Sequence, residues 1–131
     1  AQMLVKLNHF DDWQKRRTQI AEYYTNRLCS FVDVLGPNEH VEHAWHKYVL
    51  RAHTHRSNLK QHLSILGIET KIHYPTLICD QEAYSKKYPH SSFEIPNARK
   101  QSKKILSIPI HQHLSQKELE YISESLEKTC E

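Results

Sequence analysis

The sequence predicts an α+β domain in which helices pack on one face of a small, mainly antiparallel sheet. Apolar residues recur every three to four positions in residues 2–29, 55–66 and 119–126, as they do on helices with one buried face. Shorter stretches between these segments alternate apolar and polar side chains, which is typical of strands. The resulting order is helix, strand, strand, helix, strand, loop, helix, strand, helix, without internal repeats.

The first predicted helix, over residues 2–29, is unusually long. Its apolar stripe comprises Met3, Leu7, Phe10, Trp13, Ile20, Tyr24, Leu28 and Phe31. A helix of this length suggests a connection between two bodies, because a small domain rarely contains one. A short strand is predicted next at residues 31–35, and it is closed by a turn at Gly36, Pro37 and Asn38.

The second strand is predicted over residues 44–52. One of its faces carries Trp45, Lys47, Val49 and Arg51, and the other carries His46, Tyr48, Leu50 and Ala52. We interpret His46 and Tyr48 as packing residues that brace this strand.

Residues that follow the second predicted helix form the first candidate site. Gly67 ends that helix, because glycine adopts the left-handed conformation of a helix end at low cost. Residues 68–72 alternate as a third strand, and Pro75 must end it. His73 and Tyr74 therefore lie at a strand exit, where binding groups are often placed. A solvated histidine beside a stacked Tyr–Pro pair is the other interpretation, and residue types alone leave both open.

A polar, turn-rich surface loop is predicted at residues 85–94, and a helix begins at Pro96. That helix directs four basic residues outward and turns two apolar ones inward: Arg99, Lys100, Lys103, Lys104, Ile105 and Leu106. Residues 106–109 form a short extended segment.

The last helix has a clear start signal. Ser115 and Glu118 have the spacing of a capping box, and Leu114 is placed to pack on Leu119 as a hydrophobic staple. Its buried line comprises Leu119, Ile122 and Leu126.

Composition limits the function classes. The 131 residues allow one domain with a modest core, and 38% apolar content is low for a self-sufficient globule. Because the chain opens at Ala1 in a helical pattern, we expect a piece of a longer protein. Three cysteines without a CxxC motif predict neither a disulfide framework nor a zinc site, and favour a reducing cytoplasm. A net charge of +3 and no membrane-length apolar run give no reason to expect nucleic acid or a membrane as partner.

Histidines and basic clusters offer weaker candidates. Eleven histidines invite a metal site, and the closest set is His40, His43 and His46. On a strand His46 points away from His43, and no acid or cysteine stands at ligand spacing, so we predict no metal site. The pairs His53 with His55 and His111 with His113 are interpreted as solvated turn residues or as part of a polar rim. The basic groups at 15–17 and 99–104 are interpreted as solvated helix faces. No catalytic residue is predicted, because Cys79 stands alone and no nucleophile, Walker or dinucleotide motif occurs.

Five motifs occur in an order that carries a family resemblance. They are Lys6-Leu7 with Trp13 and Arg16-Arg17; residues 45–51, WHKYVLR; Gly67-Ile68 leading to His73-Tyr74-Pro75; Gln81-Glu82-Ala83-Tyr84; and residues 106–115, LSIPIHQHLS. Together they cover essentially the whole chain, which resembles the C-terminal region of the DegT/DnrJ/EryC1/StrS sugar-nucleotide aminotransferases.

The resemblance implies a fold of the aspartate-aminotransferase type. Residues 1–131 would be the C-terminal small domain, and a large domain absent from this chain would hold pyridoxal phosphate on a lysine. The parent would be a homodimer that moves an amino group from glutamate onto a nucleotide-linked keto sugar. The chain alone is expected to bind no coenzyme and to be inactive. His73 and Tyr74 match the segment that approaches the sugar nucleotide, whereas Cys79 replaces a histidine common in relatives, which leaves the substrate open.

Two alternatives come from other classes. In the first, the protein is a regulatory or degenerate member of the pyridoxal phosphate fold that catalyses no reaction. In the second, it is a histidine-rich metal-binding module. Truncation also predicts self-association of the fragment through exposed Phe10, Trp13 and Tyr74.

Overall fold

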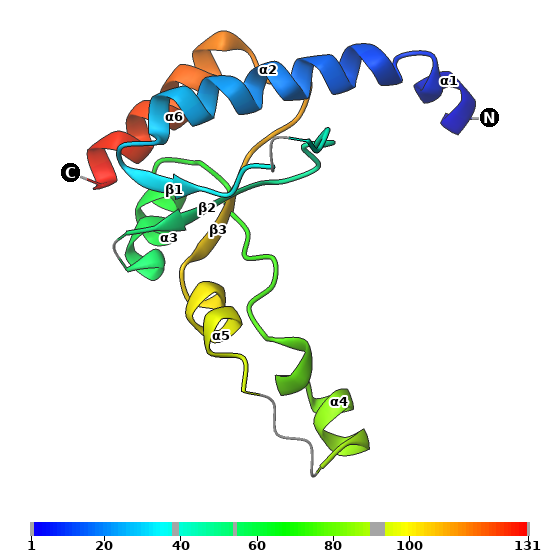
Figure 1. Ribbon diagram of the computed structural model, residues 1–131. Coiled ribbons are helices and arrows are strands. Elements are labelled where there is room, and N and C mark those ends of the chain that lie inside the picture. The colour runs from blue at the N-terminus through cyan, green and yellow to red at the C-terminus, as the bar shows by residue number, and fades with distance from the viewer. Residues whose placement is uncertain (1, 38–39, 54, 90–93, 131) are drawn as a thin grey trace.

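The computed structural model describes residues 2–37, 40–53, 55–89 and 94–130. Its elements are α1 (Gln2–Leu7), α2 (Phe10–Leu28), β1 (Val32–Val34), β2 (Tyr48–Ala52), α3 (Arg56–Ile65), the 3-10 turn η1 (Ile78–Asp80), α4 (Glu82–Lys87), α5 (Pro96–Ser102), β3 (Ile105–Ile108) and α6 (Gln116–Cys130). Figure 1 shows α2 and α6 side by side along the sheet, while α4 and α5 lie on an arm that projects away from it.

The sheet has three antiparallel strands in the order β1-β2-β3, which confirms the predicted α+β class. Its central strand, β2, alternates between two environments. Tyr48, Leu50 and Ala52 are buried against the helices, whereas Val49 and Arg51 are half-buried on the other face. This period of two places one face of the sheet in the core and leaves the opposite face partly exposed.

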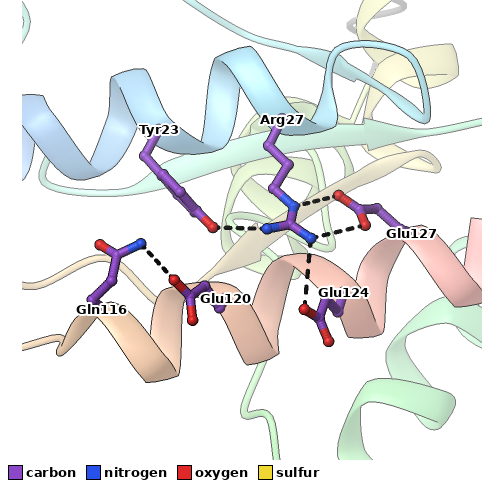
Figure 2. A network of polar contacts seen from close by, with 6 residues as sticks. All are labelled: Tyr23, Arg27, Gln116, Glu120, Glu124 and Glu127. Carbon is purple, nitrogen blue, oxygen red and sulfur yellow. Dashed lines mark hydrogen bonds and ion pairs between the residues drawn. The ribbon is translucent and has the colours of Figure 1, made fainter.

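The core joins α2, α3 and α6 to the buried face of the sheet. It includes the predicted line Leu119, Ile122 and Leu126 on α6, all at most 5% exposed. At the edge of this core, polar contacts join α2 to α6 (Figure 2). There Arg27 donates from Nε and Nη2 to the two carboxylate oxygens of Glu127, at 2.6 and 3.2 Å, and from Nη1 to the hydroxyl of Tyr23 at 3.0 Å.

The predicted first helix is interrupted. Residues 8 and 9 form a turn in which the His9 amide donates to the Lys6 carbonyl at 3.1 Å, so α1 and α2 are separate helices. Asn8 favours such a turn because its side chain competes for backbone hydrogen bonds. None of the residues in α1 is buried, so packing against the described part of the chain does not hold the two helices in one continuous helix.

The second and third predicted strands are both shorter than expected. β2 begins at Tyr48 rather than residue 44, because buried Trp45 adopts a left-handed conformation with φ of +45° that no strand contains. Residues 68–72 keep their alternation, with Ile68 and Thr70 buried, yet they form only a single bridge from Lys71 to Ser107 of β3.

The C-terminal predictions are mostly confirmed. Gly67 has the expected positive φ, at +75°, after α3. The capping box is present: the Ser115 amide donates to Glu118 Oε2 at 2.8 Å, and the Glu118 amide donates to Ser115 Oγ at 3.3 Å. The loop at 85–94 is wrong in part, since α4 continues to Lys87; residues 90–93 lie outside the described residues, as does Asn38 of the predicted turn.

The helix that begins at Pro96 is also shorter than predicted. Ile105 and Leu106 belong to β3, where cross-strand pairing with β2 buries Leu106. On the arm, the carboxylate of Asp80 accepts from both terminal nitrogens of Arg99, at 2.5 and 2.8 Å, so this arginine is not simply solvated. Across the described ranges, no helix has the length and apolar character needed to span a membrane.

Candidate functional site

The predicted site residue His73 lies at the free edge of β3. The segment before it pairs with this edge through Lys71, whose amide donates to the Ser107 carbonyl at 3.0 Å while the Ser107 amide donates back at 2.7 Å. The Ser107 hydroxyl, in a residue only 6% exposed, lies 2.9 Å from His73 Nδ1. One ring nitrogen is thus occupied by the fold, and Nε2 is left to meet a ligand.

Tyr74 follows His73 and is 66% exposed. The Lys47 ammonium lies 3.5 Å from its hydroxyl and 5.3 Å from the centre of its ring. The His73 ring approaches it edge-on at 5.5 Å. A contact of this kind at an exposed site is worth about 0.5–1 kcal/mol, so it favours this orientation of Tyr74 only weakly.

His73 and Lys47 line a cavity of about 670 Å³, which opens beside β3 and the start of α6. Four segments form it: residues 46–47, 67–73, 107–111 and 114–122. Its lining combines apolar side chains with ionisable groups. The ionisable lining residues are His46, Lys47, Glu69, Lys71, His73, His111, Glu118 and Tyr121.

Two ionisable groups of this cavity, His73 and Glu118, have shifted pKa values. Removal from water, together with the nearby charges of Lys47 and Lys71, holds the pKa of His73 below its ordinary value. Hydrogen bonds from the Ser115 hydroxyl and amide hold the pKa of Glu118 below its usual range. At neutral pH His73 therefore offers a neutral imidazole, and Glu118 is an ionised carboxylate committed to the start of α6.

The structure corrects two sequence interpretations near this cavity. Tyr48 is a buried packing residue as predicted, but His46 is exposed and lines the cavity, because β2 begins after it. Arg16 and Arg17 are not solvated: Arg16 donates to the Leu114 carbonyl at 3.0 Å, and Arg17 donates to the Trp45 carbonyl at 3.3 Å. These arginines tie α2 to the loop beside the cavity.

Sequence reasoning missed Lys47 and Ser107 as site residues. The sequence pattern places Lys47 on the strand face that also carries Trp45, and it places Ser107 only within a short extended segment. The signal for Ser107 is a polar residue between two buried apolar ones, Leu106 and Ile108. Such a residue needs a hydrogen-bond partner, and His73 supplies it.

The remaining histidines and Cys79 were the other candidate site residues. Within the described ranges no group of three or more histidine, cysteine or acidic side chains is placed to hold a metal ion. His43 instead accepts from the Trp45 amide through Nδ1 at 2.9 Å. His53 contacts Asp33 at 2.9 Å. Cys79 lies on the arm, 3.9 Å from the Arg99 guanidinium.

The residues of this chain do not fit a complete pyridoxal phosphate site. Of the two lysines in the cavity, Lys71 is exposed and paired with Glu69 at 3.1 Å, while Lys47 is half-buried against Tyr74. Neither lysine is enclosed by the residues around it, as a lysine that forms a covalent bond with a coenzyme is. No step through the coenzyme follows from this chain.

Comparison with known proteins identifies what the chain resembles. The sequence profile of the DegT/DnrJ/EryC1/StrS aminotransferase family matches residues 1–127. The chain is 37% identical over 129 residues to the erythromycin biosynthesis sensory transduction protein EryC1 of Saccharopolyspora erythraea, covering 96% of this chain and 34% of that protein. It is 30% identical over 118 residues to dTDP-3-amino-3,4,6-trideoxy-alpha-D-glucose transaminase of Streptomyces venezuelae, covering 87% of this chain and 30% of that protein.

Solved structures give the same result. A DegT DnrJ EryC1 StrS aminotransferase from Brucella abortus superposes with a TM-score of 0.86 at 28% identity, covering 95% of this chain and 33% of that one. DesV from S. venezuelae superposes with a TM-score of 0.88 at 26% identity, covering 97% and 34%. The chain therefore spans about a third of the length of the relatives it matches.

Proposed function

The chain belongs to the DegT/DnrJ/EryC1/StrS aminotransferase family, and from that membership we propose that it is the C-terminal small domain of a sugar-nucleotide aminotransferase. The longer protein transfers an amino group from glutamate to a nucleotide-linked keto sugar, with pyridoxal phosphate held by its large domain and a homodimer as its working form. The single observation that supports this most is the match across 127 residues to proteins about three times longer. The three free cysteines suit a reducing cytoplasm.

The contribution of this domain is to bind and orient the sugar nucleotide. His73 presents a nitrogen from a ring fixed by Ser107, and Tyr74 presents a hydroxyl held by Lys47. Because the His73 ring is already restrained by Ser107, less of its side-chain entropy is lost on binding. Neither residue supplies a proton in the reaction we propose; they set where the sugar lies relative to the coenzyme.

A test of the catalytic class needs the longer protein. Its reading frame should encode an upstream domain with a lysine that binds the coenzyme, and the purified protein should show the visible absorbance of bound pyridoxal phosphate. It should also aminate a nucleotide-linked keto sugar with glutamate as donor. A reading frame without such a lysine overturns the proposal.

The role of His73 is tested by steady-state kinetics in that protein. His73→Asn should raise KM for the sugar nucleotide about tenfold, the equivalent of one lost hydrogen bond, and leave kcat within about threefold. His62→Asn, which alters an exposed histidine on α3, is the matched control and should change neither constant. Equal effects of the two substitutions would remove His73 from the site.

A second candidate is a regulatory member of the same fold. Two relatives favour it by name: the EryC1 protein is described as a sensory transduction protein, and a Geobacillus stearothermophilus relative, 29% identical over 126 residues, as a pleiotropic regulatory protein. This candidate predicts a longer protein that binds the sugar nucleotide but catalyses no amino transfer. A histidine-rich metal module has no such support, and equilibrium dialysis against zinc should find no stoichiometric uptake.

A further inference from the structure

Two loops that supply the lining of the cavity beside His73 are both held by α2. The β2 approach loop, residues 43–47, ends with His46 and Lys47, which line the cavity. The α6 approach loop, residues 109–115, follows β3 and supplies another part of the lining. Because the two loops are far apart in the sequence, their separation across the cavity is set by the side chains that connect them in space.

Arg17 of α2 contacts both loops. Its Nη1 donates to the Trp45 carbonyl of the β2 approach loop at 3.3 Å. Its Nε and Nη2 both donate to Gln112 Oε1 of the α6 approach loop, at 3.3 and 3.2 Å. The planar guanidinium fixes the directions of these donors, so one half-buried side chain sets the separation of the two loops.

Two neighbouring side chains of α2 reach one loop each. Gln14 donates from Nε2 to the His43 carbonyl of the β2 approach loop at 3.0 Å. Arg16 donates from Nη2 to the Leu114 carbonyl of the α6 approach loop at 3.0 Å. Neither contact links the two loops to each other, as the guanidinium of Arg17 does.

The backbone that Arg17 holds is strained. Trp45 has a φ of +45°, a costly conformation for a bulky residue, and is only 8% exposed. Its amide donates to His43 Nδ1 at 2.9 Å, so the Arg17 contact completes the pairing of both polar backbone atoms of Trp45. Two residues later, the Lys47 ammonium lies 5.3 Å from the centre of the Tyr74 ring. A relaxed φ at Trp45 redirects Lys47, because a backbone rotation turns the residues that follow it.

We propose that Arg17 is a positioning residue, which holds Trp45 in its left-handed conformation and thereby directs Lys47 into the cavity toward Tyr74. Arg17 is not one of the residues that line the cavity, so it acts through the loops. The effect on a bound sugar nucleotide rests on the proposed function, whereas the position of Lys47 is a property of this chain alone. In a purely structural role, loss of Arg17 lowers stability and leaves the contact between Lys47 and Tyr74 in place.

Nuclear magnetic resonance of the 131-residue chain tests the position of Lys47. The ring current of Tyr74 should displace the side-chain proton signals of Lys47, and Tyr74→Leu identifies this displacement by removing it. Arg17→Met should abolish most of the displacement. Arg27→Met is the matched control and should keep it, because it removes a guanidinium near the other end of α2 that pairs with Glu127. No displacement in the unaltered chain, its retention in Arg17→Met or an equal loss in Arg27→Met overturns the proposal.

Arg17→Lys separates the charge from the contact with two loops, and it serves where Arg17→Met does not fold. Lysine keeps the positive charge but is a point charge without the planar fork. Arg17→Lys should therefore abolish most of the displacement, as Arg17→Met does. Full retention in Arg17→Lys shows that the charge alone is sufficient and overturns the proposal.

Steady-state kinetics of the longer protein test the consequence for the ligand. Arg17→Lys should raise KM for the sugar nucleotide about fivefold, the upper end of what an exposed cation–aromatic contact is worth, and leave kcat within about twofold. Added to Lys47→Met, it should raise KM no further, because both substitutions act through the same side chain. Arg27→Met should leave KM within about twofold. Multiplying KM effects in the double variant, or an equal rise in Arg27→Met, overturns the proposal.

These outcomes are separable from the proposed function. A longer protein that lacks coenzyme and transaminase activity refutes the enzyme, while the displacement of the Lys47 signals still decides the role of Arg17. An active transaminase whose isolated domain keeps the displacement in Arg17→Met and Arg17→Lys refutes the role of Arg17 alone.

Discussion

The ion pair between Arg27 on α2 and Glu127 on α6, called the clamp below, allows a direct test of what holds these two helices together. Arg27 makes two charge-assisted hydrogen bonds to Glu127, and the two side chains are 32% and 20% exposed (Figure 2). Arg27→Met keeps most of the apolar stem of the side chain, but it leaves the Glu127 carboxylate without its partner. The pair is less exposed than a surface ion pair, worth 0.2–1 kcal/mol, and less buried than a pair in a core, which costs 3–5 when broken. We expect a loss of about 1.5 kcal/mol in the free energy of unfolding.

A double-mutant cycle isolates the interaction from packing changes. Urea unfolding at 25 °C and pH 7, followed by circular dichroism at 222 nm, should give a coupling energy of about 1 kcal/mol between Arg27→Met and Glu127→Gln. Glu124 is the control, because its carboxylate lies 3.8 Å from the guanidinium and its side chain is 51% exposed. Its coupling to Arg27 should stay below about 0.3 kcal/mol. Equal coupling for the two glutamates would refute the assignment of the clamp to Glu127.

Three further predictions concern stability. Tyr24 is fully buried, and its hydroxyl donates to the Pro109 carbonyl at 3.1 Å. Tyr24→Phe removes this hydroxyl and should lower the free energy of unfolding by about 1–2 kcal/mol in thermal melts. An unchanged free energy of unfolding would contradict this prediction. Ser115→Ala removes the cap of α6 and should cost about 1 kcal/mol, which Ser115→Thr should largely restore. Burial raises the pKa of Tyr48 to about 12, above the 10 of an unfolded tyrosine. The unfolded state therefore loses its proton first, and the free energy of unfolding should fall as the pH rises from 10 to 12. Tyr48→Phe should flatten that slope, and an unchanged slope would contradict the burial argument.

His73 titrates in the opposite sense. Because its pKa in the folded state is below the ordinary value, the unfolded state takes up a proton at a higher pH than the folded state. The contribution of this residue to stability is therefore complete above pH 6.5 and declines as the pH falls through the folded pKa.

Local patterns in the sequence determined much of the fold. The capping box of Ser115 and Glu118 and the positive φ of Gly67 depend on contacts within a few residues, so both are visible in the sequence. The alternation of buried residues in β2 and the buried line of α6 also follow from periodicity. These elements are sufficient for the α+β class and, with the ordered motifs, for the family.

Only the tertiary structure decided the composition of the cavity. The hydroxyl of Ser107 and the ring of His73 are 34 residues apart, and Lys47 and Tyr74 are 27 apart; their pairing depends on how β3 meets its edge segment. Trp45 fits the alternation of a strand, but two hydrogen bonds override that local preference: Arg17 of α2 donates to its carbonyl, and its own amide donates to His43. Periodicity reports which side chains avoid water, whereas the partners of polar groups are set by long-range geometry, and the site is made of such groups.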